Sequence, residues 1–222
     1  AAAKIAAGED ILNAAKTMNA KGGVFRTYPR EIKMHLGIKT AEAAIIAGDI
    51  KSGIKYLGML AKESPRPKEI DQLAYMEGSI KQMQGNFPGA IKAWEEVEKG
   101  EHRPSVAKAV LSRTELQLTT KRVKGKDVIK ELENLRFAWR GGLFEFSLLR
   151  KLGELYIEVG EYSKGLRTLR TAVSNFRGNP DASKITQKME LAFQDLYLNQ
   201  YKTLCQVYKR MYLELQMKSY NQ

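Results

Sequence analysis

The stretch LGELYIEVGEYSKGLRTL, Leu152 to Leu169, carries three glycines among residues that otherwise favour a helix. Gly160 precedes an acidic and an aromatic residue, after which an amphipathic helical pattern resumes. We interpret Gly160 as the end of one helix, where a left-handed residue without a Cβ closes the last turn. Gly153 and Gly165 then lie inside the two flanking helices, where each costs up to about 1 kcal/mol of helix propensity. Close packing of two antiparallel helices explains both, so we expect near-backbone contact between Gly153 and Gly165.

Two other places in the chain repeat this pattern. Gly160-Glu161-Tyr162 is matched by Gly48-Asp49-Ile50 and Gly85-Asn86-Phe87. The polar residue after each glycine is suited to cap the next helix or to complement its positive end. Small residues recur around each turn: inside the second helix these are Gly53, Ala90 and Gly165, and on the facing helix Gly78 and Gly153. Recurrence at three places indicates an internal repeat of helix pairs.

The composition supports an all-α protein without a membrane span. The chain has 222 residues, of which 43% are hydrophobic and 28% charged, with six prolines. Strand-like alternation of β-branched and aromatic residues is nearly absent. No apolar run reaches the roughly 18 residues that a spanning helix needs. A single cysteine excludes an internal disulfide.

The pattern resembles the tetratricopeptide repeat, a 34-residue helix-turn-helix with small residues at its eighth and twentieth places. Residues 71–104 match at Gly78, Ala90 and Trp94, and residues 146–179 match at Gly153, Tyr156, Gly160 and Gly165. Residues 34–67 form a weaker match, and residues 105–145 fill the interval as an irregular repeat. Flanking helices are expected within 1–22 and 181–222, with Asp127 capping the second helix of the irregular repeat. The resemblance implies one all-α domain over 1–222, a right-handed superhelix of antiparallel helical hairpins.

The segment 105–198 also resembles secreted tetratricopeptide-like proteins of alphaproteobacteria. This resemblance implies a periplasmic or cell-envelope location, with the cytoplasm as the alternative. Because the first residue is Ala1, we expect the chain to be part of a longer protein. After Asn199 the sequence departs from that group, so whether residues 200–222 belong to the family stays open.

The sequence contains no motif for catalysis, for a metal or for a cofactor. His35 and His102 lack neighbouring ligands at zinc-site spacing. Phosphate-loop, dinucleotide-binding and nucleophile-elbow motifs are missing. Glu154 and Glu158 are spaced as a carboxylate pair, but acidic helix faces are commonly solvated. We therefore expect a protein that is not an enzyme and that uses neither a metal nor a cofactor.

The resemblance implies that the first helix of each repeat lines a concave groove for a protein or peptide ligand. The predicted groove residues are Tyr75, Ser79, Gln82, Arg150 and Glu154, with Arg113 added from the irregular repeat. A mixed aromatic, basic and acidic lining suits an extended or helical protein segment.

Two alternatives remain open from the sequence. The formal net charge of +12 and the basic turn Lys121, Arg122, Lys124 and Lys126 are compatible with nucleic-acid binding, although aromatics for base stacking are missing there. The C-terminal apolar stripe consists of Tyr201, Leu204, Tyr208, Met211 and Leu215. This stripe either covers the open end of the repeat stack or mediates self-association and partner docking.

Overall fold

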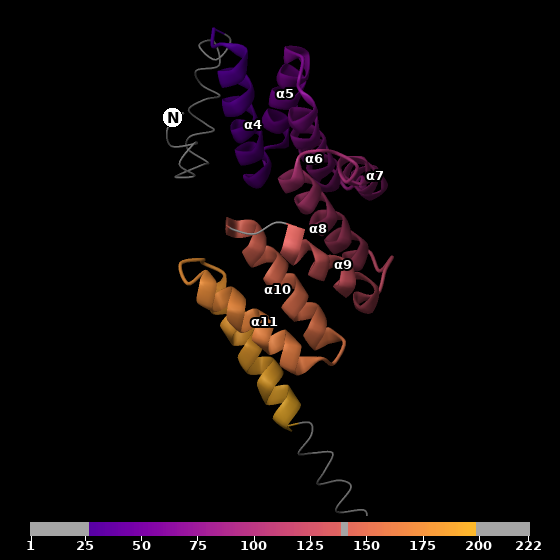
Figure 1. Ribbon diagram of the computed structural model, residues 1–222, viewed down its shortest axis with the longest axis vertical. Coiled ribbons are helices and arrows are strands. Elements are labelled where there is room, and N and C mark those ends of the chain that lie inside the picture. The colour runs from indigo at the N-terminus through magenta and orange to yellow at the C-terminus, as the bar shows by residue number, and fades with distance from the viewer. Residues whose placement is uncertain (1–26, 139–141, 199–222) are drawn as a thin grey trace, which may run out of the picture. The chain divides into compact units, whose positions relative to one another are not determined.

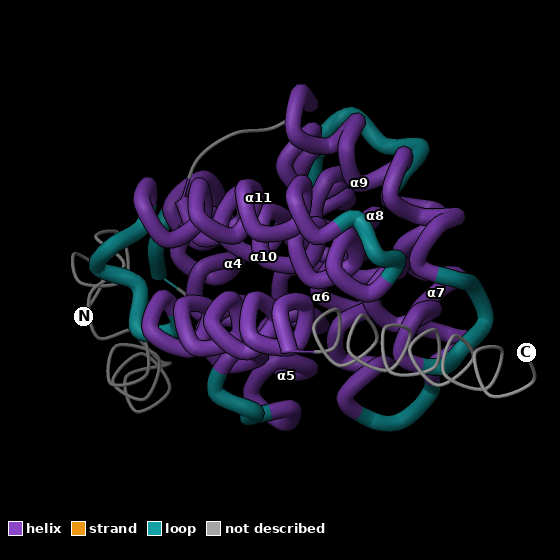
Figure 2. Tube along the Cα trace, turned by 90° about the horizontal axis from the view of Figure 1, so that it is seen from below, coloured by secondary structure: helices purple, strands orange, loops and turns teal. Residues whose placement is uncertain are grey.

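The structure, a computed structural model, describes residues 27–138 and 142–198. Every regular element in these ranges is a helix, and the helices pack against their neighbours in the chain (Figure 1). Figure 2 correspondingly shows the described parts as helices joined by short loops. The prediction of an all-α protein is therefore confirmed for these residues. The helices expected in 1–22 and 200–222 lie outside them.

Long and shorter helices alternate along the chain. The long ones, α4 (Arg30–Ile46), α6 (Pro67–Met83), α8 (Arg103–Thr119) and α10 (Gly142–Glu158), have 17 residues each. The shorter ones are α5 (Ile50–Leu60), α7 (Phe87–Val97), α9 (Gly125–Ala138) and α11 (Tyr162–Asn175), and a further helix covers residues 182–198. A 3₁₀ turn, η1 (Ala61–Glu63), follows α5. The starts of α4, α6 and α10 precede the predicted repeat starts by about one helical turn.

The three predicted glycine turns are left-handed, as expected. Gly48, Gly85 and Gly160 have φ of 77°, 78° and 87°. After the first two, the side chains of Asp49 and Asn86 each accept a hydrogen bond from a backbone amide of the next helix. Glu161 makes no such cap and instead forms an ion pair with Lys164 at 2.6 Å. A carboxylate at this position still complements the positive end of α11.

A fourth turn of the same kind lies at Lys121, where the sequence shows no glycine. Lys121 has φ of 56°, and its amide donates to Leu118 O while the Arg122 amide donates to Gln117 O. The turns at Gly48, Gly85 and Gly160 make the same two backbone bonds, at 2.7–3.0 Å. Lys121 also lies nearly midway between Gly85 and Gly160 along the chain. The irregular segment 105–145 therefore keeps the register of its neighbours at this turn.

The glycines inside the helices mark close approaches between neighbouring helices. A Cβ on Gly165 would lie 2.9 Å from the carbonyl oxygen of Gly153, and one on Gly153 would lie 3.2 Å from that of Gly165. The predicted near-backbone contact between these glycines is confirmed. A Cβ on Gly78 would lie 2.4 Å from the indole nitrogen of Trp94, which donates to the Tyr75 carbonyl at 3.2 Å.

The described residues form two compact units. The first runs from α4 to the turn after α8 and includes the end of α9, and the second contains the start of α9, α10, α11 and the 182–198 helix. Ala90 and Trp94 are fully buried in the first core, with Val97 and Leu116. In the second unit, Phe146, Leu149, Leu169 and Ile185 form a core cluster. The single domain predicted over 1–222 stays a prediction.

Two helix starts differ from expectation. His102 caps α8, because its Nδ1 accepts a hydrogen bond from the Ser105 amide at 3.3 Å. Pro104, in the first turn of α8, was the only sign of this helix start in the sequence. Asp127 was expected to cap α9, but that prediction is wrong because α9 already begins at Gly125. Gly125 fits at this start because a Cβ there would lie only 3.2 Å from Leu155.

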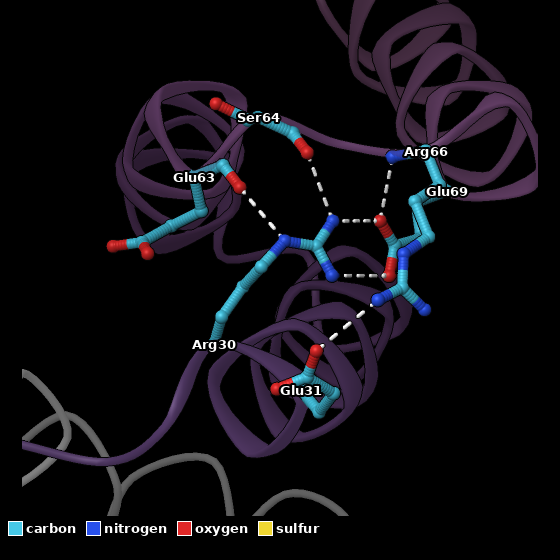
Figure 3. Close-up of polar contacts among 6 residues, drawn as sticks. All are labelled: Arg30, Glu31, Glu63, Ser64, Arg66 and Glu69. Atoms are coloured by element: carbon cyan, nitrogen blue, oxygen red, sulfur yellow. Dashed lines mark hydrogen bonds and ion pairs between the residues drawn. The ribbon is translucent and has the colours of Figure 1, made fainter.

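A polar cluster fixes the starts of α4 and α6 beside the loop that follows η1 (Figure 3). The Arg30 guanidinium binds both carboxylate oxygens of Glu69, at 2.5 and 3.3 Å, and also donates to the carbonyls of Glu63 and Ser64. Glu69 in turn accepts from the backbone amide of Arg66, which precedes α6. Burial by itself raises the pKa of Glu69, but the bonds from Arg30 and Arg66 outweigh it and hold that pKa below its ordinary value.

Candidate functional site

The first unit contains a cavity of about 250 Å³ between α4, α6 and α8. These are the first helices of three consecutive helix pairs. The cavity is lined by Ile38, Lys39 and Glu42 of α4, by Gln72, Tyr75 and Met76 of α6, and by His102, Pro104, Ser105 and Lys108 at the start of α8. Apolar, aromatic and charged groups therefore face one shared space.

Charge in the cavity centres on Glu42. Its carboxylate accepts a bond from Lys108 Nζ at 2.6 Å and forms a longer ion pair with Lys39 at 3.5 Å. Burial raises the pKa of Glu42, but the two lysines together hold it below its ordinary value. The side chains of Lys108 and Lys39 are 38% and 46% exposed, so both still reach solvent. One carboxylate is thus shared by two accessible cations.

The Tyr75 ring forms an aromatic wall of the cavity. Lys108 Nζ lies 5.8 Å from the ring centroid, and the Tyr75 hydroxyl lies 3.3 Å from Ser112 Oγ on α8. Ser79 is partly buried and its hydroxyl donates to the Tyr75 carbonyl, one turn back along α6. Gln82 is exposed one further turn along. Of the three predicted groove residues on α6, Tyr75 lines the cavity, and the other two follow on the same helix face.

His102 also lines the cavity, just before the start of α8. Its ring is within 2.8 Å of Ser105 Oγ, and its backbone amide donates to Asp71 at 2.8 Å. Burial and the positive charges of Lys108 and Lys68 lower the pKa of His102, although Asp71 opposes them. The imidazole therefore stays neutral at pH 7 and keeps a free electron pair for the cap of α8.

Arg113, also predicted to line the groove, lies elsewhere. Its guanidinium binds the Glu98 carboxylate at 2.5 and 3.3 Å and donates to Gln117 Oε1 at 3.0 Å. Its side chain is only 12% exposed. Arg113 thus joins α8 to the end of α7 and does not line the cavity.

Arg150 and Glu154 lie in the second unit, on the side of α10 that is associated with the 182–198 helix. Lys188 of that helix binds Glu154 at 2.5 Å. The pKa of Asp181 is lowered mainly by its contact with Lys184, and the positive charge of Arg150 adds to this effect. Arg150 Nε is buried and has no hydrogen-bond partner. Neither residue is among those that line the cavity around Tyr75.

The residues that the sequence analysis missed are Lys39, Glu42, His102 and Lys108. The sequence held a signal for Glu42, because it occupies the ninth place of the 34–67 repeat, as Ser79 does in the 71–104 repeat. Lys108 holds the same position in α8 as Gln72 holds in α6 when residues are counted from the start of each helix. This equivalence becomes visible only once the start of α8 is known. The sequence does not reveal the turn at Lys121 that sets the register of α8, so it predicts Arg113 as a groove residue instead of Lys108.

The described ranges contain no cluster of three or more His, Cys, Asp or Glu side chains suited to a metal ion. Within the same ranges no helix is both long and apolar enough to span a bilayer. Comparison of the chain with protein-family models, with curated proteins and with solved structures found no match.

Proposed function

We propose that this protein is a non-catalytic interaction scaffold that binds a protein or peptide segment along its long helices. The observation that carries the proposal is the cavity between α4, α6 and α8, to which three successive long helices contribute side chains. A groove assembled from equivalent helices is the usual ligand surface of helical-repeat proteins. We place the scaffold in the bacterial envelope, on the sequence resemblance alone.

The tetratricopeptide-like stack of hairpins is part of this proposal. It is supported by four identical backbone turns and by small, buried residues seven places before each of them, namely Ala41, Gly78, Thr114 and Gly153. The chain departs from the family pattern in two consistent ways. Its turns recur at slightly longer intervals than the family repeat, and its long helices start about one turn early.

The lining of the cavity favours a ligand with both apolar and acidic side chains. Tyr75, Ile38 and Met76 offer apolar surface, while Lys39 and Lys108 offer two partly exposed cationic side chains. An acidic group on the ligand would compete with Glu42 for these lysines. Such mixed grooves recognise extended or helical protein segments.

The proposal is tested by site-specific photocrosslinking. A photoreactive residue at Gln72, in the cavity, is compared with one at Lys92, which is exposed on α7. We expect a discrete adduct from position 72 that weakens in a Lys39→Glu background and persists in a Lys51→Glu background. Adducts that are identical from positions 72 and 92, or that ignore Lys39→Glu, would contradict a groove-bound ligand.

Nucleic-acid binding is the alternative, and it rests on the net charge of +12 and the exposed Lys121 and Arg122. A phosphate-binding surface would give affinity for generic DNA that falls steeply with salt. On our proposal, a mobility-shift titration at about 50 mM salt detects no complex. A complex that is lost in a Lys121→Glu/Arg122→Glu variant would favour the alternative instead.

A further inference from the structure

The second unit has an open apolar groove between α11 and the 182–198 helix. Its volume is about 470 Å³, and its apolar lining comes from Leu166, Met189 and Phe193. Arg167, Arg170 and Glu190 supply charged lining. Phe193 is 50% exposed and Tyr197, 4.4 Å from it between ring centroids, is 57% exposed. Large apolar side chains left open beside a groove indicate a missing packing partner.

The register of the chain indicates what that partner is. Each of α4, α6, α8 and α10 has the same length and is followed by a left-handed residue, after which the chain returns as a second helix. The 182–198 helix is described over the same number of residues. In each long helix the left-handed residue lies two places after the last helical one, which corresponds to Gln200 here. The spacing from Lys121 to Gly160, counted on from Gly160, reaches Asn199, whereas the shorter spacings of the earlier turns reach residues 196 and 197, which are still helical.

The sequence around Asn199 has the features of a turn. Asn199-Gln200-Tyr201 parallels Gly160-Glu161-Tyr162, and Ala192 lies seven places before Asn199, as Gly153 does before Gly160. Asparagine is the residue after glycine that most readily adopts the left-handed conformation at a helix end. Lys121 shows that this chain makes the same turn without glycine.

We propose that the groove between α11 and the 182–198 helix is the docking site for residues 201–215 of the same chain, which return after a turn at Asn199-Gln200. The stripe Tyr201, Leu204, Tyr208, Met211 and Leu215 supplies the apolar face that this groove lacks. Docking within one chain is favoured over a second copy because the connection is only about two residues long, which keeps the loop-closure cost small. This inference rests on the repeated helix pairs and turns, and it does not depend on what the cavity of the first unit binds.

Cys205, the only cysteine, makes the docking measurable in the full chain. We introduce a second cysteine as Arg170→Cys or Glu190→Cys in the groove. The matched control is Gln187→Cys, which is exposed on the same helix as Glu190 but does not line the groove. Under mild oxidation we expect an intramolecular disulfide with Cys205 from at least one groove position and much less from position 187. The yield should not change on dilution.

Two outcomes would overturn the proposal. A disulfide-linked dimer formed preferentially at the groove positions would assign the groove to a second copy. Equal yields at groove and control positions, or no disulfide at all, would show that the segment does not dock there.

A second measurement does not depend on disulfide geometry. Cys205 lies three residues from Tyr208 on the docking face, so docking should shield its thiol from a soluble reagent. We expect Phe193→Asp to speed the labelling of Cys205 several-fold, while Leu191→Asp, exposed on the same helix outside the groove, leaves it unchanged. Labelling that is equally fast in all three proteins would refute docking.

Discussion

Gly165 shows, at the scale of a residue, how a missing side chain sets the distance between α10 and α11. A Cβ there would meet backbone atoms at 2.9 and 3.1 Å, and backbone cannot rotate away as a side chain can. We expect Gly165→Ala to lower the free energy of unfolding by about 2 kcal/mol, although alanine gains about 1 kcal/mol in helix propensity. Gly58 in α5 is the control, because a Cβ there meets nothing within 4 Å. Gly58→Ala should stabilise by about 0.5–1 kcal/mol, and equal signs for the two variants in denaturant unfolding would contradict this account.

Thr114 occupies the buried place in α8 where the other long helices carry alanine or glycine. Its side chain is fully buried, and its hydroxyl has no hydrogen-bond partner. Valine has nearly the same shape without the polar atom. We therefore expect Thr114→Val to raise the free energy of unfolding by about 1 kcal/mol, because an unsatisfied buried hydroxyl is costly. Denaturant unfolding of Thr114→Val and Thr114→Ser tests this, since serine retains the hydroxyl and should not stabilise.

His102 combines a capping role with a lowered pKa, and this makes a prediction about pH. The unfolded chain binds a proton near the ordinary histidine value of 6.5, whereas the folded chain does so only at lower pH. The contribution of His102 to stability is therefore complete above pH 6.5 and shrinks as the pH falls below it. Asparagine at 102 keeps a capping acceptor but does not titrate.

We expect the melting temperature of the wild type to fall more between pH 7 and pH 5 than that of His102→Asn. The titratable or charged groups that act on this imidazole are Asp71, Lys108 and Lys68. Because carboxylates common to both proteins cancel in the comparison, thermal unfolding of the two across this range isolates the histidine. Parallel curves for the two proteins would show that protonation of His102 is not linked to folding.

At the scale of an element, Lys121 is the non-glycine residue among the four matching left-handed turns at 48, 85, 121 and 160. A residue with a side chain costs roughly 1–2 kcal/mol in the left-handed region, and glycine does not have this cost. Glycine loses more conformational entropy on folding, however, and this offsets part of its advantage. Lys121→Gly should therefore stabilise by about 0.5–1 kcal/mol. The reverse change at the matching turn, Gly85→Lys at φ 78°, should destabilise. Chemical denaturation of both variants checks the pair, and a destabilised Lys121→Gly would contradict the assigned conformation.

The same turn explains how far the sequence could predict the elements. The glycines at 48, 85 and 160 predicted the three turns from the sequence. They also predicted the helix pairs and the contact between Gly153 and Gly165. A lysine at the equivalent position carries no local signal, so the register of α8 was not visible from its own residues. The cavity was predictable only in part for this reason. Tyr75 was found from its place in a repeat, whereas Lys108 and His102 are positioned by a helix start that only the structure fixes.

At the scale of the whole molecule, the described residues separate into two compact units, each with its own core. The core clusters around Trp94 and around Leu169 share no residue. Compact units with separate cores can open one at a time, with local stabilities that differ along the chain. A substitution buried in one unit should therefore weaken that unit more than the other.

Native-state hydrogen exchange on the full chain measures this directly. We expect Gly165→Ala to accelerate amide exchange in α10, α11 and the 182–198 helix, while amides in α4 to α7 keep their wild-type rates. Gly78→Ala, which would push a Cβ into the Trp94 indole, should give the opposite distribution. The two substitutions have the same chemistry and differ in the unit that receives them. If either one accelerated exchange equally in both units, the chain would unfold as a single cooperative body, and the division into two units would have no energetic meaning.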